Sequence, residues 1–381
     1  MLFGISTLAL SGLIGGAVSL AQVSTAGGYL QDSADAGAIN VAVAIRDGDD
    51  PDALEALADN SIGRRNGRNR FELISQTPIT VSFTASRDVH PILGPLIGRD
   101  TVQVTRRATA VVEAGKPVCL LVLSASQPQA LSRRGASSLE APNCVAQVNS
   151  SSPEAIESRG SGTVRMLQTR VTGSGTDIGG FLPAPTLGAA RVTDPYADTN
   201  WPAAGACAPL DTSVKKRVLS LAAGVHCGDI DVGSGGELVL GPGVHIITGS
   251  LTMRAGAKLI ATQGSSLVFV GDDSTLDIQA QSELRITAPT TGPWAGVAIA
   301  VKPQTTERTS EILGGGQIVV DGTVYLPTQL LYLTGGGSLA EPTEATRAFV
   351  VNRLELRGNG RVFLNAGETK ATTGGGVRLI E

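Results

Sequence analysis

The chain has 381 residues, a net charge of −4 and only 17% charged residues. Its length gives room for two or three domains, and its acidic balance gives no electrostatic support for nucleic-acid binding. Glycine is frequent, at 48 residues, whereas aromatic residues make up only 3%. This composition favours β-structure with a narrow apolar interior and glycine at its corners. The apolar content of 42% is too high for a disordered chain.

The N-terminal segment, residues 1–28, contains no charged side chain. Its apolar run from Leu2 to Val23 is long enough to cross a hydrocarbon core of about 30 Å as a helix. We therefore expect a transmembrane anchor over residues 1–28. A signal peptide that is cleaved near Ser24–Ala26 and a soluble buried helix are the alternatives.

Residues 29–75 are expected to form a helical and flexible membrane-proximal segment. The apolar residues of its first part recur at the helical spacing of three and four: Leu30, Ala34, Ala38, Val41 and Ile45. The later ranges 47–50 and 64–70 are polar and predict flexible chain.

Residues 76–180 are rich in alternating and β-branched segments, at 78–86, 101–113 and 117–124. We expect them to form the first and less regular part of a β-solenoid. The next range, 181–223, is rich in Pro and Ala and predicts a linker.

Residues 224–365 contain the clearest pattern of the chain. Apolar side chains alternate in short runs that glycine-rich turns separate, at 237–240, 244–247, 250–253, 258–261, 266–269, 275–278 and 283–286. Alternation with period two buries one face of each strand, and the turns are too short to hold helices. Such strands stack into a regular β-solenoid. We expect a flexible tail at 366–381, so the predicted fold is mainly β, with an N-terminal transmembrane helix before a β-solenoid body.

The four cysteines fall into two local pairs, separated by 25 and 20 residues. In an oxidising compartment this arrangement predicts the disulfides Cys119–Cys144 and Cys207–Cys227, each of which closes a loop worth about 3 kcal/mol. Four reduced and buried thiols are the alternative. No pair has the Cys-x-x-Cys spacing of a zinc ribbon.

No catalytic, cofactor-binding or metal-binding residue is predicted. Stacked β-coils also occur in glycan-active enzymes, which need converging carboxylates. Here the aspartates are Asp229, Asp231, Asp272, Asp273, Asp277 and Asp321. Most are expected to stabilise turns, and weak calcium binding by Asp229 and Asp231 is the other reading. His226 and His245 occur in the similar phrases Gly-Val-His-Cys and Gly-Val-His-Ile, which indicates equivalent strand positions rather than zinc ligands.

Three segments together resemble the TadG-like proteins of tight-adherence (Flp/Tad-type) pilus assembly. They are Tyr-Leu-Gln-Asp-Ser-Ala-Asp-Ala-Gly-Ala (29–38) after the apolar run, the pair Val-Ser-Phe-Thr-Ala-Ser-Arg-Asp-Val (81–89) and Arg-Arg-Ala-Thr-Ala-Val-Val (106–112), and the stretch from Val-Cys-Leu-Leu-Val-Leu (118–123) to Leu-Gly-Pro-Gly-Val-His-Ile-Ile (240–247). The resemblance is to the β-solenoid version of the family. No Asp precedes Ser124–Ser126, so the metal site of a von Willebrand A module is not expected.

The resemblance implies a non-catalytic accessory or scaffold protein of Tad/Flp pilus assembly that supports pilus biogenesis and surface adhesion. Its implied location is the inner membrane, as a single-pass protein with the C-terminal body in the periplasm. The implied partners are other pilus components of the minor-pilin kind, together with glycan or cell-wall surfaces. A glycan-active enzyme on a β-helix and a secreted adhesin are the alternative functions.

Overall fold

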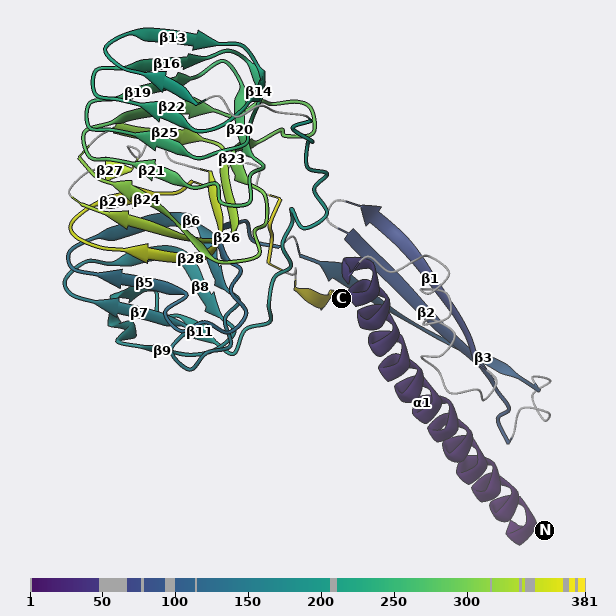
Figure 1. Ribbon diagram of the computed structural model, residues 1–381. Coiled ribbons are helices and arrows are strands. Elements are labelled where there is room, and N and C mark those ends of the chain that lie inside the picture. The colour runs from purple at the N-terminus through teal and green to yellow at the C-terminus, as the bar shows by residue number, and fades with distance from the viewer. Residues whose placement is uncertain are drawn as a thin grey trace. The chain divides into compact units, whose positions relative to one another are not determined.

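The computed structural model shows a mainly β protein with one N-terminal helix (Figure 1). It describes residues 2–47, 67–76, 79–92, 100–113, 115–205, 211–315, 317–335, 338–339, 347–365, 370–373 and 376–380. The chain divides into two compact units. The helix–sheet unit comprises Met1–Gly115 with Gly374–Glu381, and the β-stack comprises Lys116–Thr373. The β-stack is thus inserted into the sequence of the other unit.

The helix–sheet unit combines one long helix with an antiparallel sheet. Helix α1 spans Leu2–Asp47. The sheet has the order β1-β2-β3-β30, with bounds Gly67–Gln76, Ile79–Val89, Val102–Val112 and Val377–Ile380. The C-terminal strand β30 pairs with the end of β3, where Val112 lies opposite Val377. The tail predicted at 366–381 therefore contains a strand of this sheet.

The C-terminal half of α1 packs on one face of this sheet. Its buried residues Leu30, Ala34, Ala38 and Val41 form one apolar cluster with alternate residues of β2, among them Phe83. Gly37 lies against the ring of Phe83, because a Cβ atom on Gly37 would be 2.6 Å from the ring. The helical register predicted for residues 30–45 is present, and it positions the helix on the sheet.

The predicted membrane anchor falls on the first half of α1. The side chains before Ala17 lie outside the described part of the structure. Among the described residues, no helical segment is both long and apolar enough to cross a bilayer.

The strands of the β-stack form three columns, A, B and C, in which neighbours pair in parallel. Column A contains β14 (Gly224–His226), β17 (Gly243–Ile247), β20 (Ser265–Phe269), β23 (Val297–Val301), the first halves of β26 (Thr323–Thr334) and β28 (Ala348–Leu356), β4 (Val118–Val122), the second halves of β6 (Ser138–Val148) and β8 (Val164–Val171), and β11 (Thr186–Leu187).

Column B contains β12 (Thr212–Val214), β15 (Ile230–Val232), β18 (Leu251–Met253), β21 (Leu276–Ile278), β24 (Arg308–Leu313), the second halves of β26 and β28, β5 (Leu131–Arg134), β7 (Ile156–Arg159) and β9 (Gly175–Thr176). Column C contains β13 (Val218–Leu221), β16 (Glu237–Leu240), β19 (Lys258–Ala261), β22 (Glu283–Thr287), β25 (Gln317–Asp321), β27 (Ser338–Leu339), β29 (Arg361–Phe363), the first halves of β6 and β8, and β10 (Phe181–Leu182). A short 3₁₀ helix, η2 (Ile178–Gly180), follows β9.

Two segments of the chain share this stack. Strands β4–β11 occupy one end, and the chain then crosses to the other end and returns through β12–β29. The last strands, β28 and β29, pair with the first ones, β4, β5 and β6. The points where the chain enters and leaves the β-stack consequently meet: Pro117 bridges to Thr372, and the backbone N–H of Lys116 donates to Oγ1 of Thr373 at 2.9 Å.

Alternate side chains of the regular strands are buried, as the sequence pattern predicts. In β16 Leu238 and Leu240 face the interior, and Leu284 and Ile286 do so in β22. Every range predicted as a strand between 237 and 286 overlaps an observed strand.

Glycine in the left-handed region recurs at the corner between columns B and C. The sequence of corner residues down the stack is Gly235, Gly256, Gln281, Gly315, Gly335, Gly358, Gly135 and Gly160, with φ between +65° and +105°. A side chain at Gly160 would lie 2.3 Å from the carbonyl oxygen of Gly135. Glycine adopts such a corner without strain, and seven of the chain's 48 glycines lie at this one.

The observed boundaries differ from the predicted ones in three more places. Strand β1 falls almost entirely within 29–75, which the sequence predicts as helical and flexible chain. Strands β2 and β3, which lie inside the range 76–180, belong to the antiparallel sheet of the helix–sheet unit. The range 181–223, predicted as a linker, contains the strands β10, β11, β12 and β13 of the stack. Alternation identified the strands but not their partners.

Candidate functional site

The outward side of column A is apolar, unlike that of columns B and C. Its register runs from Ile246 through Val268, Ala300 and Tyr325 to Val350. The last four of these are less than 3% exposed. They form a second core that includes Tyr196 and Trp294. This face is therefore covered, and residues 189–201, which we call the strap, contribute to the cover.

Aromatic residues hold the strap against column A. Tyr196 and Trp201 of the strap lie 5.0 and 6.1 Å from the ring centre of Tyr325, and Trp201 lies 5.3 Å from that of Trp294. Aromatic pairs at such distances contribute about 0.5–1.5 kcal/mol beyond their buried area. Both tryptophans of the chain thus lie in this one cluster.

Asn149 forms hydrogen bonds with the strap at Arg191 and Val192. Its side-chain amide donates to the carbonyl oxygen of Val192 at 2.7 Å and accepts from the N–H of Val192 at 3.0 Å. Arg191 donates to the carbonyl oxygens of Asn149 and Ala125, at 3.1 and 2.8 Å. Because Asn149 is 6% exposed and bonded on both amide atoms, it stabilises the fold here.

A groove of about 520 Å³ lies beside the strap, and its lining includes Asn149, Arg191, Asp194, Pro303 and Tyr325. The Tyr325 hydroxyl donates to Oδ2 of Asp194 at 2.8 Å. Burial raises the pKa of Tyr325, and the hydrogen bond and charge of Asp194 raise it further. Tyr325 therefore stays protonated and acts as a hydrogen-bond donor. The polar groups of the groove form hydrogen bonds mainly with one another, which is typical of an interface that packs two segments of a chain together.

Four of the candidate aspartates have other partners, whereas Asp277 lies opposite Glu311 on the next strand of column B. Asp231 pairs with Arg254 at 3.2 Å, Asp321 with Arg347 at 2.8 Å, and Asp273 with Arg308. Oδ1 of Asp229 accepts from the N–H of Ser250 at 2.7 Å, which is turn chemistry.

Asp231 and Asp277 lie in one outward row of column B but two strands apart, because Thr252 lies between them. Two strand spacings amount to about 9.6 Å, at the upper limit for a pair of glycosidase carboxylates. Within the described residues, no group of three His, Cys, Asp or Glu side chains could hold a metal ion.

His226 and His245 form a stacked pair at the β14 end of column A. Nε2 of His226 lies 3.0 Å from Nδ1 of His245, and the ring centres are 5.2 Å apart. His245 is fully buried, and its Nε2 lies 2.8 Å from the carbonyl oxygen of Gly241. A carbonyl only accepts, so His245 donates from Nε2 and accepts from His226 at Nδ1. Burial lowers the pKa of both rings, so both are neutral.

The register corrects one detail of the sequence interpretation. Gly224 of β14 lies opposite His245, and His226 lies opposite Ile247. The two Gly-Val-His phrases are therefore offset by two residues, and the histidines are not at equivalent positions. This offset brings the two rings into contact on the same side of the strands.

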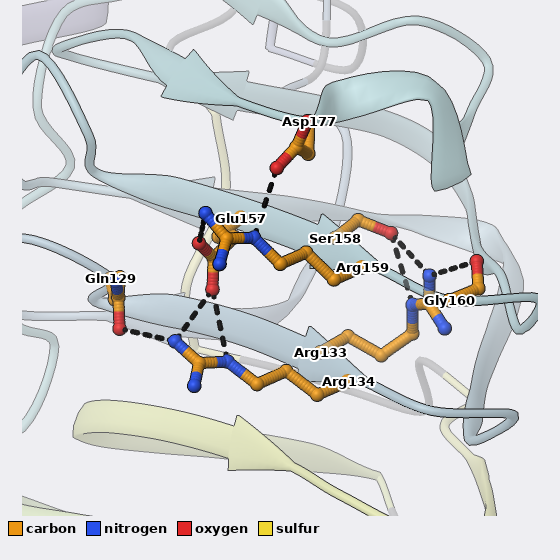
Figure 2. A network of polar contacts seen from close by, with 8 residues as sticks. All are labelled: Gln129, Arg133, Arg134, Glu157, Ser158, Arg159, Gly160 and Asp177. Atoms are coloured by element: carbon orange, nitrogen blue, oxygen red, sulfur yellow. Dashed lines mark hydrogen bonds and ion pairs between the residues drawn. The ribbon is translucent and has the colours of Figure 1, made fainter.

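A polar network covers column B near its other end (Figure 2). Glu157 is 1% exposed and pairs with Arg134 at 2.8 Å and Arg159 at 2.9 Å, and Arg159 also pairs with Asp177. Arg133 is fully buried and donates to Oγ of Ser158 and to the carbonyl oxygen of Gly160. Burial lowers the pKa of Arg133. The sequence interpretation missed this residue, although an Arg where alternation expects an apolar side chain could have revealed it.

Two of the four cysteines are joined as the spacing predicts. A disulfide links Cys119 of β4 to Cys144 of β6, with Cα atoms 5.7 Å apart, and both residues are fully buried. Cys227 is also disulfide-bonded. Cys207 lies outside the described residues.

Comparison of this chain with protein-family models, with characterised proteins and with solved structures finds no match.

Proposed function

We propose that the chain is a non-catalytic accessory or scaffold protein of a Tad/Flp-type pilus, anchored in the inner membrane by the first half of α1. In this proposal the β-stack is a β-solenoid displayed in the periplasm. Its partners are other pilus components of the minor-pilin kind, and it supports pilus biogenesis and adhesion to glycan or cell-wall surfaces.

The observation that carries the proposal is the way the β-stack is inserted. The chain enters it after β3 and leaves it before β30, and these two strands are neighbours in the sheet that α1 packs on. The β-stack is therefore joined to the helix–sheet unit by two chain crossings instead of one, an arrangement that suits a body carried by an anchored unit.

Two further features support this proposal. Residues 2–29 have no charged side chain, and they continue into the packed half of α1 as one helix. The buried Cys119–Cys144 disulfide suits an oxidising compartment. Asp231 and Asp321 each pair with one arginine, and Asp229 accepts from a turn N–H, which favours a structural role for these three over glycoside hydrolysis.

Membrane fractionation in the native host, followed by pull-down with pilus components, tests the proposal. The full chain should resist carbonate extraction and co-purify with those components. Leu13→Arg, which places a charge in the apolar run, should move the protein to the soluble fraction. Asn40→Arg is the matched control, because Asn40 is exposed on the same helix beyond that run.

Two results would replace the proposal with an alternative. A soluble protein with a mature N-terminus near Gly27 would identify a secreted adhesin. Cleavage of a glycan by the purified chain, abolished by Asp231→Asn, would identify an enzyme.

A further inference from the structure

Five arginines lie on the half of the antiparallel sheet where β2 ends, divided between its two faces. Arg87 and Arg106 share the face on which α1 packs, and Arg68, Arg70 and Arg107 lie on the other face. In the register of β1, β2 and β3, Arg70 lies in one row with Arg107, the next row contains Arg106, and Arg87 lies opposite Gly67. Arg68 is adjacent, and all five arginines are exposed. This group, the basic end, consists of Arg68, Arg70, Arg87, Arg106 and Arg107.

Few acids oppose this charge. Asp88 lies 3.4 Å from Arg68, and both side chains are well exposed, at 44% and 79%. Asp100 precedes β3 at the same end of the sheet and is also exposed. Glu72 is also exposed, two residues from Arg70 in β1, so five arginines against three acids leave two positive charges among these described residues.

Helix α1 extends beyond the sheet at this same end (Figure 1). Gly27 lies against Arg106, since a Cβ atom on Gly27 would be 2.6 Å from Nη2 of that arginine. Further along, Gly37 lies against Phe83 in the middle of β2. The helix therefore runs toward its N-terminus past the basic end. Residues 2–17, which precede the part of α1 that lies beside β2, are uncharged.

A hollow of about 560 Å³ lies between α1 and the end of β2. Its polar lining includes Gln22, Thr25 and Tyr29 of α1 with Arg87 and His90, and Val18 and Ala21 contribute apolar surface. Asp88 also lines the hollow. The hydroxyls of Thr25 and Tyr29 lie on α1 beside its apolar surface, and the cationic Arg87 lies on β2, a combination that suits an amphiphile with an anionic head.

We propose that the basic end binds the phosphate headgroups of anionic phospholipids at the point where α1 enters the membrane. The inference rests on the proposed anchorage and deepens it, because it names the lipid class and the residues. Each basic residue near an anionic bilayer surface adds about 1 kcal/mol of attraction, a factor of about five in binding. The contact also fixes which end of the sheet faces the bilayer.

Hydrogen exchange of the full chain in nanodiscs tests this inference. One preparation contains phosphatidylcholine alone, and the other contains phosphatidylcholine with about a third phosphatidylglycerol. Peptides that cover residues 67–70 and 86–90 should exchange at least fivefold more slowly in the anionic nanodiscs. Since exposed charges are screened by salt, this difference should disappear in 0.5 M salt.

Variants test whether the basic end causes this lipid dependence of hydrogen exchange. The triple variant Arg68→Gln, Arg70→Gln and Arg87→Gln should exchange at equal rates in both lipids. Asp88→Asn should strengthen the lipid dependence, because it removes an opposing charge. Arg378→Gln is the matched control: Arg378 pairs with Glu113 beyond the other end of β3, so its loss should leave the lipid dependence unchanged.

Two outcomes would overturn the inference while leaving the anchor intact. The first is equal protection of residues 67–70 and 86–90 from hydrogen exchange in both lipids. The second is that inorganic phosphate, added to neutral nanodiscs, slows exchange of these residues as much as the anionic lipid does. Failure of the chain to enter either nanodisc would instead refute the anchor, and this inference with it.

Discussion

The Tyr325 hydroxyl donates a 2.8 Å hydrogen bond to Asp194, which lies 131 positions earlier in the chain. The bond joins the strap to the outward side of column A. The outward side of column A carries apolar residues where columns B and C carry charged ones. The strap packs over these apolar residues. The segment that carries the chain from one end of the stack to the other therefore also completes its core.

Removal of this hydroxyl should loosen the strap. Tyr325→Phe is expected to cost about 1–2 kcal/mol, because a half-buried carboxylate loses a donor. Chemical denaturation measures the stability, and limited proteolysis should show faster cleavage within 189–201. Tyr29→Phe is the control, since Tyr29 is 70% exposed on α1. Unchanged cleavage of the strap in Tyr325→Phe would show that the ring alone holds it.

The histidine pair predicts a pH dependence of stability. The pKa of His226 and of His245 is lowered from 6.5 in the folded chain, first of all by burial. Below pH 6.5 the unfolded chain therefore binds more protons than the folded one, so the stability from the neutral pair is complete above pH 6.5 and is lost as the pH falls.

Denaturation curves between pH 7.5 and 5.5 check this prediction. The double variant His226→Leu, His245→Leu should have a flatter pH profile than the parent. Gly241 keeps a partner in that variant, because Ser265 also donates to its carbonyl oxygen. His90→Asn is the control, since His90 is exposed. An identical slope in the parent and the double variant would contradict the assignment to this pair.

The sequence predicts the local parts of the fold well. Strands such as β16 and β22 follow from alternation, since a half-buried strand must place Leu238 and Leu240 on one side. The helical spacing from Leu30 to Val41 predicts the face that packs on the sheet. The cysteine spacing predicts the Cys119–Cys144 bond. Each of these depends on residues close together in the sequence.

The sequence does not reveal which strands are partners over long distances. The pairing of β28 with β4 joins Val351 to Val122, and no local pattern marks it. The strands β2 and β3 alternate much as the stack strands do, yet they pair antiparallel beneath α1. Gln281 shows the same limit, since it occupies a left-handed corner, with φ +65°, that glycine occupies in neighbouring turns.

Two glycines of α1 provide a matched test of its packing on the sheet. Gly28→Ala should raise the stability of the helix–sheet unit by about 0.5–1 kcal/mol, because nothing lies within 4 Å of the new methyl group and alanine favours the helix. Gly37→Ala gains the same propensity but forces a methyl group against the buried ring of Phe83. Its stability should fall below that of Gly28→Ala by at least about 1 kcal/mol. Equal gains in the two variants would show that α1 does not rest on Phe83.

Arg133 offers the most severe single substitution in the β-stack. Its guanidinium is fully buried and is bonded to Ser158, Gly135 and Gly160. A side chain at Gly162 would lie 2.7 Å from it, so glycine makes room for the charge. Arg133→Ala should cost about 3 kcal/mol or more, because it leaves a cavity and removes three or more charge-assisted bonds.

Arg133→Leu separates these two contributions. Leucine restores much of the volume and suits the adjacent inward position of Leu356, so it should cost less than alanine if cavity formation dominates. If the lost hydrogen bonds dominate, both variants should be equally unstable. Denaturant titration at pH 7 measures both, and Arg165→Leu is the control because Arg165 is exposed on column C. A change within about 0.5 kcal/mol for all three variants would show that the corner tolerates the loss of its charge.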